Sequence, residues 1–293
     1  MPVILGEASI LTTPLSGVRI WALVSGCLTF SLAASMGVPN PPPQDIHFSL
    51  FRNFCMFTWC FFFTMSLLIL AITYVQFHSL LPFSWKNLTV TVAALAALMT
   101  FVATVLFPCL VAGKGGGGGQ SYVVTTTIFS SLNFLAYAAE THLLRREQRG
   151  YMASVPGLLK VLQVFGGTMA LLLVVDQAAH GVHPGWREVG PGVAYGLCLA
   201  ASLFTVAVMV GDCAGRCPLP FDRVLAGLSL LGVLLYMVAA VMSSTKVLQM
   251  HQEKMRAPEE KLMIISEMVF ACITLLSYTV DLAFSIKLLC DRN

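Results

Sequence analysis

Long apolar stretches alternate with short polar links along the chain, and this pattern predicts the fold. Eight stretches are continuously apolar and lack the residue-by-residue alternation of a membrane β-strand, so they predict helices. Because about 20 apolar residues cross the roughly 30 Å hydrocarbon core of a bilayer, each stretch predicts one membrane span. The predicted spans cover residues 18–37, 54–74, 88–111, 122–139, 157–175, 191–210, 224–242 and 263–289.

The amino-acid composition also indicates a membrane protein. Of the 293 residues, 57% are hydrophobic and only 11% are charged, whereas a soluble domain carries roughly 25% charged residues. Mean hydropathy is +0.81. A formal net charge of +3 provides no basic surface for nucleic acid, and low charge with high apolarity is the reverse of a disordered composition. The sequence therefore predicts an all-α, polytopic membrane protein.

The chain repeats itself. Leu81-Pro82-Phe83 precedes the third predicted span, and Leu219-Pro220-Phe221 precedes the seventh. The fourth span ends in 135–140 (Leu-Ala-Tyr-Ala-Ala-Glu), and the eighth contains 276–281 (Leu-Ser-Tyr-Thr-Val-Asp). These matches predict two four-helix units in tandem, over residues 17–145 and 155–290. Each unit has an even number of spans, so both have the same orientation, unlike the inverted repeats of many transporters.

Charged residues follow the same repeat. Arg19 and Lys160 open the first helix of each unit, and Glu140 and Asp281 lie late in the fourth, at equal separations. Charges in hydrocarbon are costly and are usually paired or functional. We predict a charge clamp, Arg19 with Glu140 and Lys160 with Asp281, which closes each unit. Two alternatives remain open: independent snorkelling into the headgroups, and a proton or ion relay.

The distribution of Lys and Arg predicts the orientation. The face that holds the N-terminus, the even-numbered links and the C-terminus carries more of them, so both termini are expected in the cytoplasm. Asn87-Leu88-Thr89 is a glycosylation acceptor pattern on that face. We therefore expect it to remain unmodified.

Basic residues and cysteines near the membrane surface are candidates for lipid contact and modification. Arg145, Arg146 and Arg149 could attract anionic lipid, and they also act as topology determinants. Cys213, Cys217 and Cys290 are juxtamembrane candidates for palmitoylation, with free reduced thiols as the alternative.

Other polar and small residues provide weaker indications. His180 and His183, with Asp176, have a spacing that could hold zinc, but such residues are common in polar loops, and no metal or cofactor is expected. Glu267, at the start of the last span, is expected to reach the membrane interface. Gly192 and Gly196 predict close helix contacts, within a unit or between copies of the chain.

Three segments resemble a known family. They are 56–61 (Met-Phe-Thr-Trp-Cys-Phe), 81–87 (Leu-Pro-Phe-Ser-Trp-Lys-Asn) and 151–162 (Tyr-Met-Ala-Ser-Val-Pro-Gly-Leu-Leu-Lys-Val-Leu). Tandem four-helix units whose last helix carries a Tyr and an acidic residue resemble MARVEL domains. The three segments resemble the myeloid-associated differentiation marker family, which is built from two such units, and the resemblance covers residues 17–289.

The resemblance implies a function that spacing does not show. MARVEL proteins are associated with membrane apposition, trafficking and cholesterol-rich microdomains, and the family implies no catalytic residues. We therefore expect a non-enzymatic plasma-membrane protein that organises membrane microdomains, membrane apposition or trafficking through lateral helix and lipid contacts. The alternatives are a transporter or channel with a polar path between the units, and an adaptor that recruits cytosolic partners.

Overall fold

The computed structural model describes eight α-helices. It covers residues 12–36, 48–76, 82–111, 120–147, 150–180, 186–211, 221–252 and 258–292. Each helix is long and apolar enough to cross a membrane, and the chain is a multi-pass integral membrane protein. The helices are α1 (Pro14–Ser35), α2 (Phe48–Tyr74), α3 (Trp85–Val111), α4 (Gln120–Glu147), α5 (Val155–His180), α6 (Trp186–Val210), α7 (Phe221–Gln252) and α8 (Pro258–Arg292).

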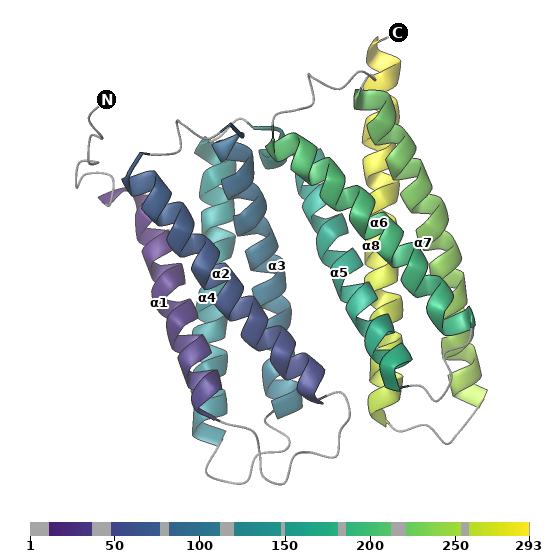
Figure 1. The fold of residues 1–293 in the computed structure, drawn as a ribbon, viewed down its shortest axis with the longest axis horizontal. Coiled ribbons are helices and arrows are strands. Elements are labelled where there is room, and N and C mark those ends of the chain that lie inside the picture. The colour runs from purple at the N-terminus through teal and green to yellow at the C-terminus, as the bar shows by residue number, and fades with distance from the viewer. Residues whose placement is uncertain are drawn as a thin grey trace. The chain divides into compact units, whose positions relative to one another are not determined.

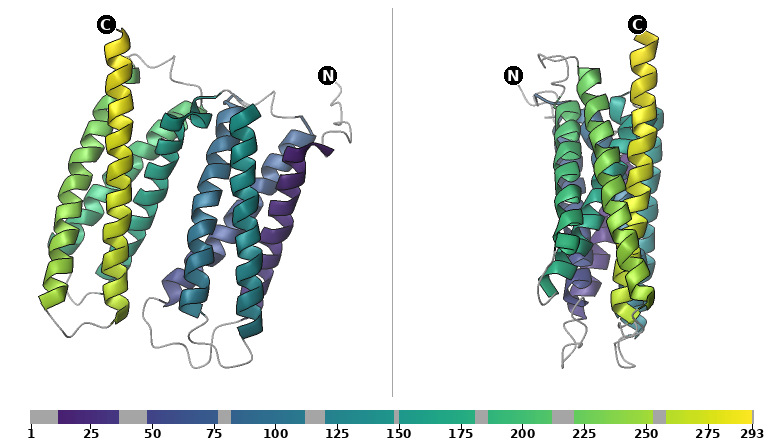
Figure 2. Two further views of the ribbon diagram at one scale, coloured as in Figure 1. Left: turned by 180° about the vertical axis from the view of Figure 1, so that it is seen from behind. Right: turned by 90° about the vertical axis from the view of Figure 1, so that its right-hand side faces the viewer.

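The chain divides into two compact units, and the boundary along the sequence lies between Ser154 and Val155. In the first unit, α1 packs against α2, α2 against α3, α3 against α4, and α4 returns to α1. The helices α5 to α8 repeat this closed ring in the second unit. Figures 1 and 2 show successive helices running in opposite directions within each unit. The first and last helices of a unit are therefore neighbours. The predicted charge clamp between these two helices requires this arrangement.

Local sequence explains how the helices begin and end. Thr13 caps α1 by accepting a hydrogen bond from the backbone of Ser16, and Pro14 occupies the first helical position, where its missing N–H costs nothing. The hydrophilic segment 243–261 lies between the last two predicted spans but is largely helical, because α7 continues to Gln252 and α8 already begins at Pro258. Both helices extend past their apolar stretch, since the Lys, Glu and Gln of this segment favour helix.

Both units bury polar side chains among apolar ones and expose large apolar side chains on their outer faces. Leu135 and Leu276 are 56% and 65% exposed on the outer faces, whereas Tyr137 and Tyr278, two positions further along, are buried. Many buried hydroxyls bond to carbonyls of their own helix; Thr29 donates to Ser25 O and Thr100 to Ala96 O. This arrangement suits a bilayer, where the outer faces meet lipid and polar groups must be satisfied within the protein.

Two glycines make room for polar side chains inside the second unit. A Cβ atom at Gly232 on α7 would overlap the ring of Tyr278 on α8, and one at Gly166 on α5 would overlap Thr274 Oγ1. Gly192 and Gly196, the two glycines predicted to form close helix contacts, differ in their surroundings. A Cβ at Gly192 would lie 3.1 Å from Val174 Cγ1 inside the unit. A Cβ at Gly196 would have none of the described atoms within 4 Å.

We expect Gly232→Ala to destabilise the second unit by about 1–3 kcal/mol, because the added methyl group must displace the Tyr278 ring. Gly227→Ala is the matched control on the same helix, since a Cβ there meets nothing within 4 Å. It should stabilise the helix by up to about 1 kcal/mol. Thermal unfolding in detergent measures both variants, and equal melting temperatures would contradict the close contact.

Candidate functional site

The described part of the first unit contains a buried ion pair. Arg19 Nε on α1 donates to Glu140 Oε1 on α4 at 2.6 Å, and both side chains are 4% exposed. The two residues are 121 positions apart and join the first and last helices of the unit. Because neither charged group reaches solvent, each depends on the other for stabilisation.

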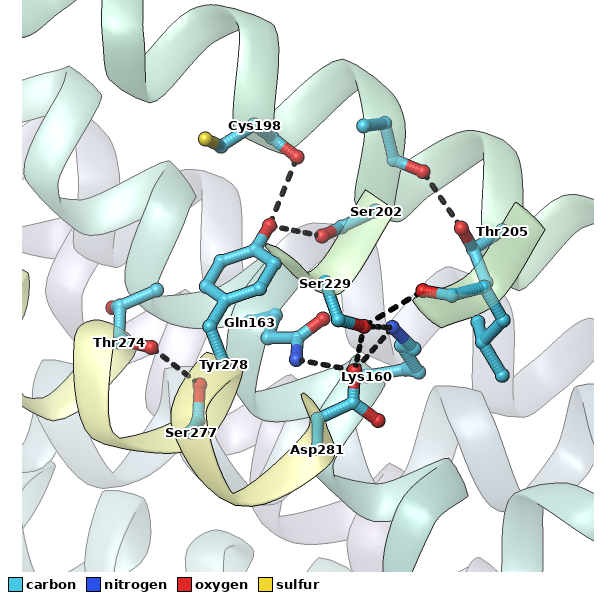
Figure 3. A network of polar contacts seen from close by, with 12 residues as sticks. Lys160, Gln163, Cys198, Ser202, Thr205, Ser229, Thr274, Ser277, Tyr278 and Asp281 are labelled. Carbon is cyan, nitrogen blue, oxygen red and sulfur yellow. Dashed lines mark hydrogen bonds and ion pairs between the residues drawn. The ribbon is translucent and has the colours of Figure 1, made fainter. Parts of the chain in front are cut away.

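The second unit repeats the pair with additional partners. Lys160 Nζ on α5 donates to Asp281 Oδ2 on α8 at 2.5 Å, again across 121 positions. Gln163 Nε2 donates to the same oxygen at 3.2 Å, and the Ser229 hydroxyl of α7 also donates to it. Figure 3 shows this network converging on one carboxylate oxygen. The other oxygen, Asp281 Oδ1, and Gln163 Oε1 are buried without a hydrogen-bond partner.

A tyrosine near each acidic residue forms the same contacts in both units. The Tyr137 hydroxyl donates to Phe62 O at 3.0 Å and bonds the Ser66 hydroxyl at 2.9 Å. The Tyr278 hydroxyl donates to Cys198 O at 3.1 Å and bonds the Ser202 hydroxyl at 2.6 Å. Each tyrosine therefore joins the last helix of its unit to the second. The repeat seen in the sequence extends to hydrogen-bond partners that the sequence analysis did not identify.

Glu267 is buried, whereas the sequence analysis expected it to reach the membrane interface. It is 0% exposed inside the second unit. Four donors from α5, α6 and α7 surround its carboxylate: Ser243 Oγ at 2.7 Å, Gln177 Nε2 at 3.1 Å, and Lys246 Nζ and Tyr195 Oη at 3.5 Å. The expectation differs from the structure because α8 begins at Pro258, before the predicted span. Glu267 therefore lies more than two turns inside this helix.

The remaining candidate residues lie at the edges of the helices. Arg145 donates to Ala153 O at 3.2 Å, and Arg146 is exposed at the end of α4. Cys290 is an exposed free thiol near the end of α8. Arg149, Cys213 and Cys217 lie outside the described residues, as does His183. Asp176 is buried, and among the residues that the structure describes no group of three ligating side chains could hold a metal ion.

The asparagine of the glycosylation pattern, Asn87, takes part in a structural contact. Asn87 Oδ1 accepts a hydrogen bond from Met152 N at 3.3 Å, so its amide group helps to hold the short helix η4 (Tyr151–Ala153) against the start of α3. Met152 itself is fully buried there. An attached glycan would have to break this contact.

Sequence comparison identifies the class and then the family. Residues 10–143 match the MARVEL model, described as a membrane-associating domain, so the chain is a MARVEL-type membrane protein. It is 35% identical to the myeloid-associated differentiation marker of Pongo abelii, over 82% of this chain and 73% of that one. It is 32% identical to human myeloid-associated differentiation marker-like protein 2, over 94% and 91% of the two chains. The Xenopus laevis homolog is 33% identical, over 81% and 76%. The chain belongs to the myeloid-associated differentiation marker family.

The MARVEL family match covers the first unit and not the second. The likeness of the second unit to the first rests on the matching ion pair and tyrosine contacts. The relatives' names describe differentiation markers, not enzymes. No solved structure matches the chain.

Proposed function

We propose that this protein organises membrane domains without catalysis, through the lipids and helices that its outer faces contact. One observation carries the proposal: in both units the described polar networks are directed inward, while large apolar side chains cover the outer faces. The surface available to partners within the bilayer is therefore the lateral surface. Close packing, rather than hydrophobic transfer, drives helix association in lipid.

The proposal includes a location and an orientation. We place the protein in the plasma membrane with both termini in the cytoplasm, since the face that holds them carries more Lys and Arg. Arg145, Arg146 and Arg149 would then face the anionic inner leaflet, at about 1 kcal/mol of attraction per residue. Cys213, Cys217 and the exposed Cys290 would be accessible to palmitoylation on that face.

The orientation predicts that Asn87 carries no glycan in cells. The control is the double variant Gly116→Asn and Gly118→Thr, which creates an acceptor pattern in the third link, on the opposite face. Treatment with a glycosidase should shift the mobility of the double variant on a gel and leave the wild-type protein unchanged. A glycan on Asn87 would reverse the orientation.

Partition between membrane phases tests the function. The full-length protein, fluorescently labelled, is followed in plasma-membrane vesicles that separate into cholesterol-rich ordered and disordered phases. We expect enrichment in the ordered phase and slowed diffusion caused by lateral association. The variant Cys213→Ser, Cys217→Ser, Cys290→Ser separates lipidation from the helices: unchanged enrichment assigns selection to the helix surfaces. Even distribution of single, freely diffusing molecules would reject the proposal.

A further inference from the structure

The short helix η4 is held at the ends of α3 and α4 by contacts from both helices. Asn87 Oδ1, at the start of α3, accepts from Met152 N at 3.3 Å, and the Met152 side chain is fully buried. Arg145 Nε, at the end of α4, donates to Ala153 O at 3.2 Å. The position of η4 therefore fixes the position of the Arg145 side chain.

Two of the three segments that resemble the family meet at this point. Segment 81–87 provides Asn87, and segment 151–162 provides η4. Gly150 permits the close approach, since a Cβ atom there would lie 2.5 Å from Asn87 Oδ1. The two segments together build a structure that is additional to the ring of four helices.

The contact with Ala153 leaves most of the Arg145 guanidinium group available. Nε provides only one of the several N–H donors of this group, and the two Nη atoms carry the others. Among the described residues, Ala153 O is the only hydrogen-bond partner of Arg145, which is exposed. Because Nε is held, the planar group is oriented, and its Nη donors can bind a phosphate group through two oxygens.

The residues around η4 lie where two membrane spans end. The membrane-spanning stretch of α3 begins at Trp85, and that of α4 ends at Glu147. Trp85 is half-buried, and its ring centroid lies 6.4 Å from that of Phe83. Tryptophan is enriched at the boundary between hydrocarbon and headgroups. Arg145 is therefore expected at the level of the lipid phosphates.

The exposed charge at this level is mainly positive. Lys86 on α3 and Arg145 and Arg146 on α4 are exposed, whereas Glu147 is the one exposed acidic residue in the last turn of α4. An anionic lipid complements this charge, and its phosphate oxygens match the geometry of a guanidinium group. Its acyl chains also suit the apolar outer faces of the two helices.

We propose that Arg145, oriented by η4, binds the phosphate group of an anionic phospholipid. The Nη groups of Arg145 donate to the phosphate oxygens, Lys86 adds a second positive charge, and the acyl chains lie beside Trp85. Asn87 and Gly150 act as positioning residues, because they hold η4 and do not touch the lipid. The proposal rests on the proposed attraction of the basic residues to anionic lipid, and it replaces a diffuse attraction at Arg145 by a specific site.

Quenching of Trp85 fluorescence by brominated lipid tests the site. The full-length protein carries Trp21→Phe and Trp186→Phe, which removes two exposed tryptophans, and a matched sample with Trp85→Phe gives the signal of the buried Trp59. Phosphatidylcholine vesicles contain either brominated phosphatidylserine or brominated phosphatidylcholine at the same mole fraction. We expect the phosphatidylserine to bind beside Trp85 at least about tenfold more tightly, since hydrogen bonds to a charged group add to the surface attraction.

Matched variants separate a specific site from a diffuse attraction. Arg145→Ala should lower the preference for phosphatidylserine about tenfold or more. Arg146→Ala removes the same charge one position away, from a residue with no hydrogen bond to η4 among those described, and should lower it about fivefold at most. Gly150→Ala keeps every charge but displaces Asn87 Oδ1, so it should also weaken the preference. Asn87→Ala, which adds no volume, serves the same purpose if Gly150→Ala does not insert.

Quenching by brominated phosphatidylcholine, equal in all variants, shows that each variant is inserted. Equal losses in Arg145→Ala and Arg146→Ala would overturn the site and leave the diffuse attraction, as would an unchanged preference in both Gly150→Ala and Asn87→Ala. Displacement of the lipid by inorganic phosphate at constant ionic strength would assign the site to a soluble anion instead. A wild-type protein without preference would reject the attraction to anionic lipid as well, whereas partition between membrane phases tests the remaining function separately.

Discussion

Arg19→Glu and Glu140→Arg are each expected to destabilise the first unit by at least about 3–5 kcal/mol, and the two changes together should restore most of the loss. Each single change places two like charges at the 2.6 Å contact inside the unit. Breaking a buried ion pair leaves an uncompensated charge that water cannot reach, which explains the size of the effect. The double variant reverses the pair and keeps it neutral. Thermal unfolding and folded yield in detergent measure both.

The second unit should respond differently to the same exchange. In Lys160→Asp with Asp281→Lys, the donors Gln163 and Ser229 would face an ammonium group instead of a carboxylate. We expect weaker restoration there than in the first unit. Arg146→Glu is the control, because Arg146 is exposed and its reversal should change stability by less than about 0.5 kcal/mol. Failure of the Arg19/Glu140 double variant to recover would show that the charges do not act as a clamp.

The helices and the pairing of charges were predictable because each depends on one strong rule. Hydrocarbon thickness requires long apolar segments, so the spans are visible in the sequence. The cost of a charge in lipid restricts Arg19 and Glu140 to partners in the protein, and the matching separation of Lys160 and Asp281 identifies the partner. The geometry follows that expectation, with the first and last helix of each unit in contact.

The polar interior could not be predicted in the same way. Whether Glu267 faces inward depends on where α8 begins and how it is rotated, and the charged segment before it resembles a link. Ser243 and Tyr195 carry no charge, so nothing in the sequence indicates that they bond the same carboxylate. Such residues are tolerated in spans with or without a tertiary partner, and only the packed structure separates the two cases.

The two units share a framework but differ in what they bury. Both have an ion pair between their first and last helices and a tyrosine that bonds the second helix. Only the second unit, among the described residues, adds a carboxylate, Glu267, bonded by the other three helices. A polar network of this size within a bilayer strengthens folding only when its members remain satisfied. The second unit should therefore be the more sensitive to a single change.

Glu267→Ala tests that sensitivity and is expected to lower the stability of the second unit by about 3–5 kcal/mol. The change leaves Gln177, Tyr195 and Ser243 without their shared acceptor and removes the partner of Lys246. An unpaired, largely buried ammonium group and unmatched donors account for the loss. Glu267→Gln should lose less, because the amide oxygen still accepts from two of the donors.

Glu147→Ala is the matched control, since this carboxylate is exposed at the end of α4 and its removal should change stability by less than about 0.5 kcal/mol. Thermal unfolding in detergent ranks the three variants. Because α5, α6 and α7 all contribute donors to Glu267, hydrogen exchange in Glu267→Ala should increase in all three near that end of the unit. Exchange that increases in α8 alone would mean that Glu267 does not hold the helices together.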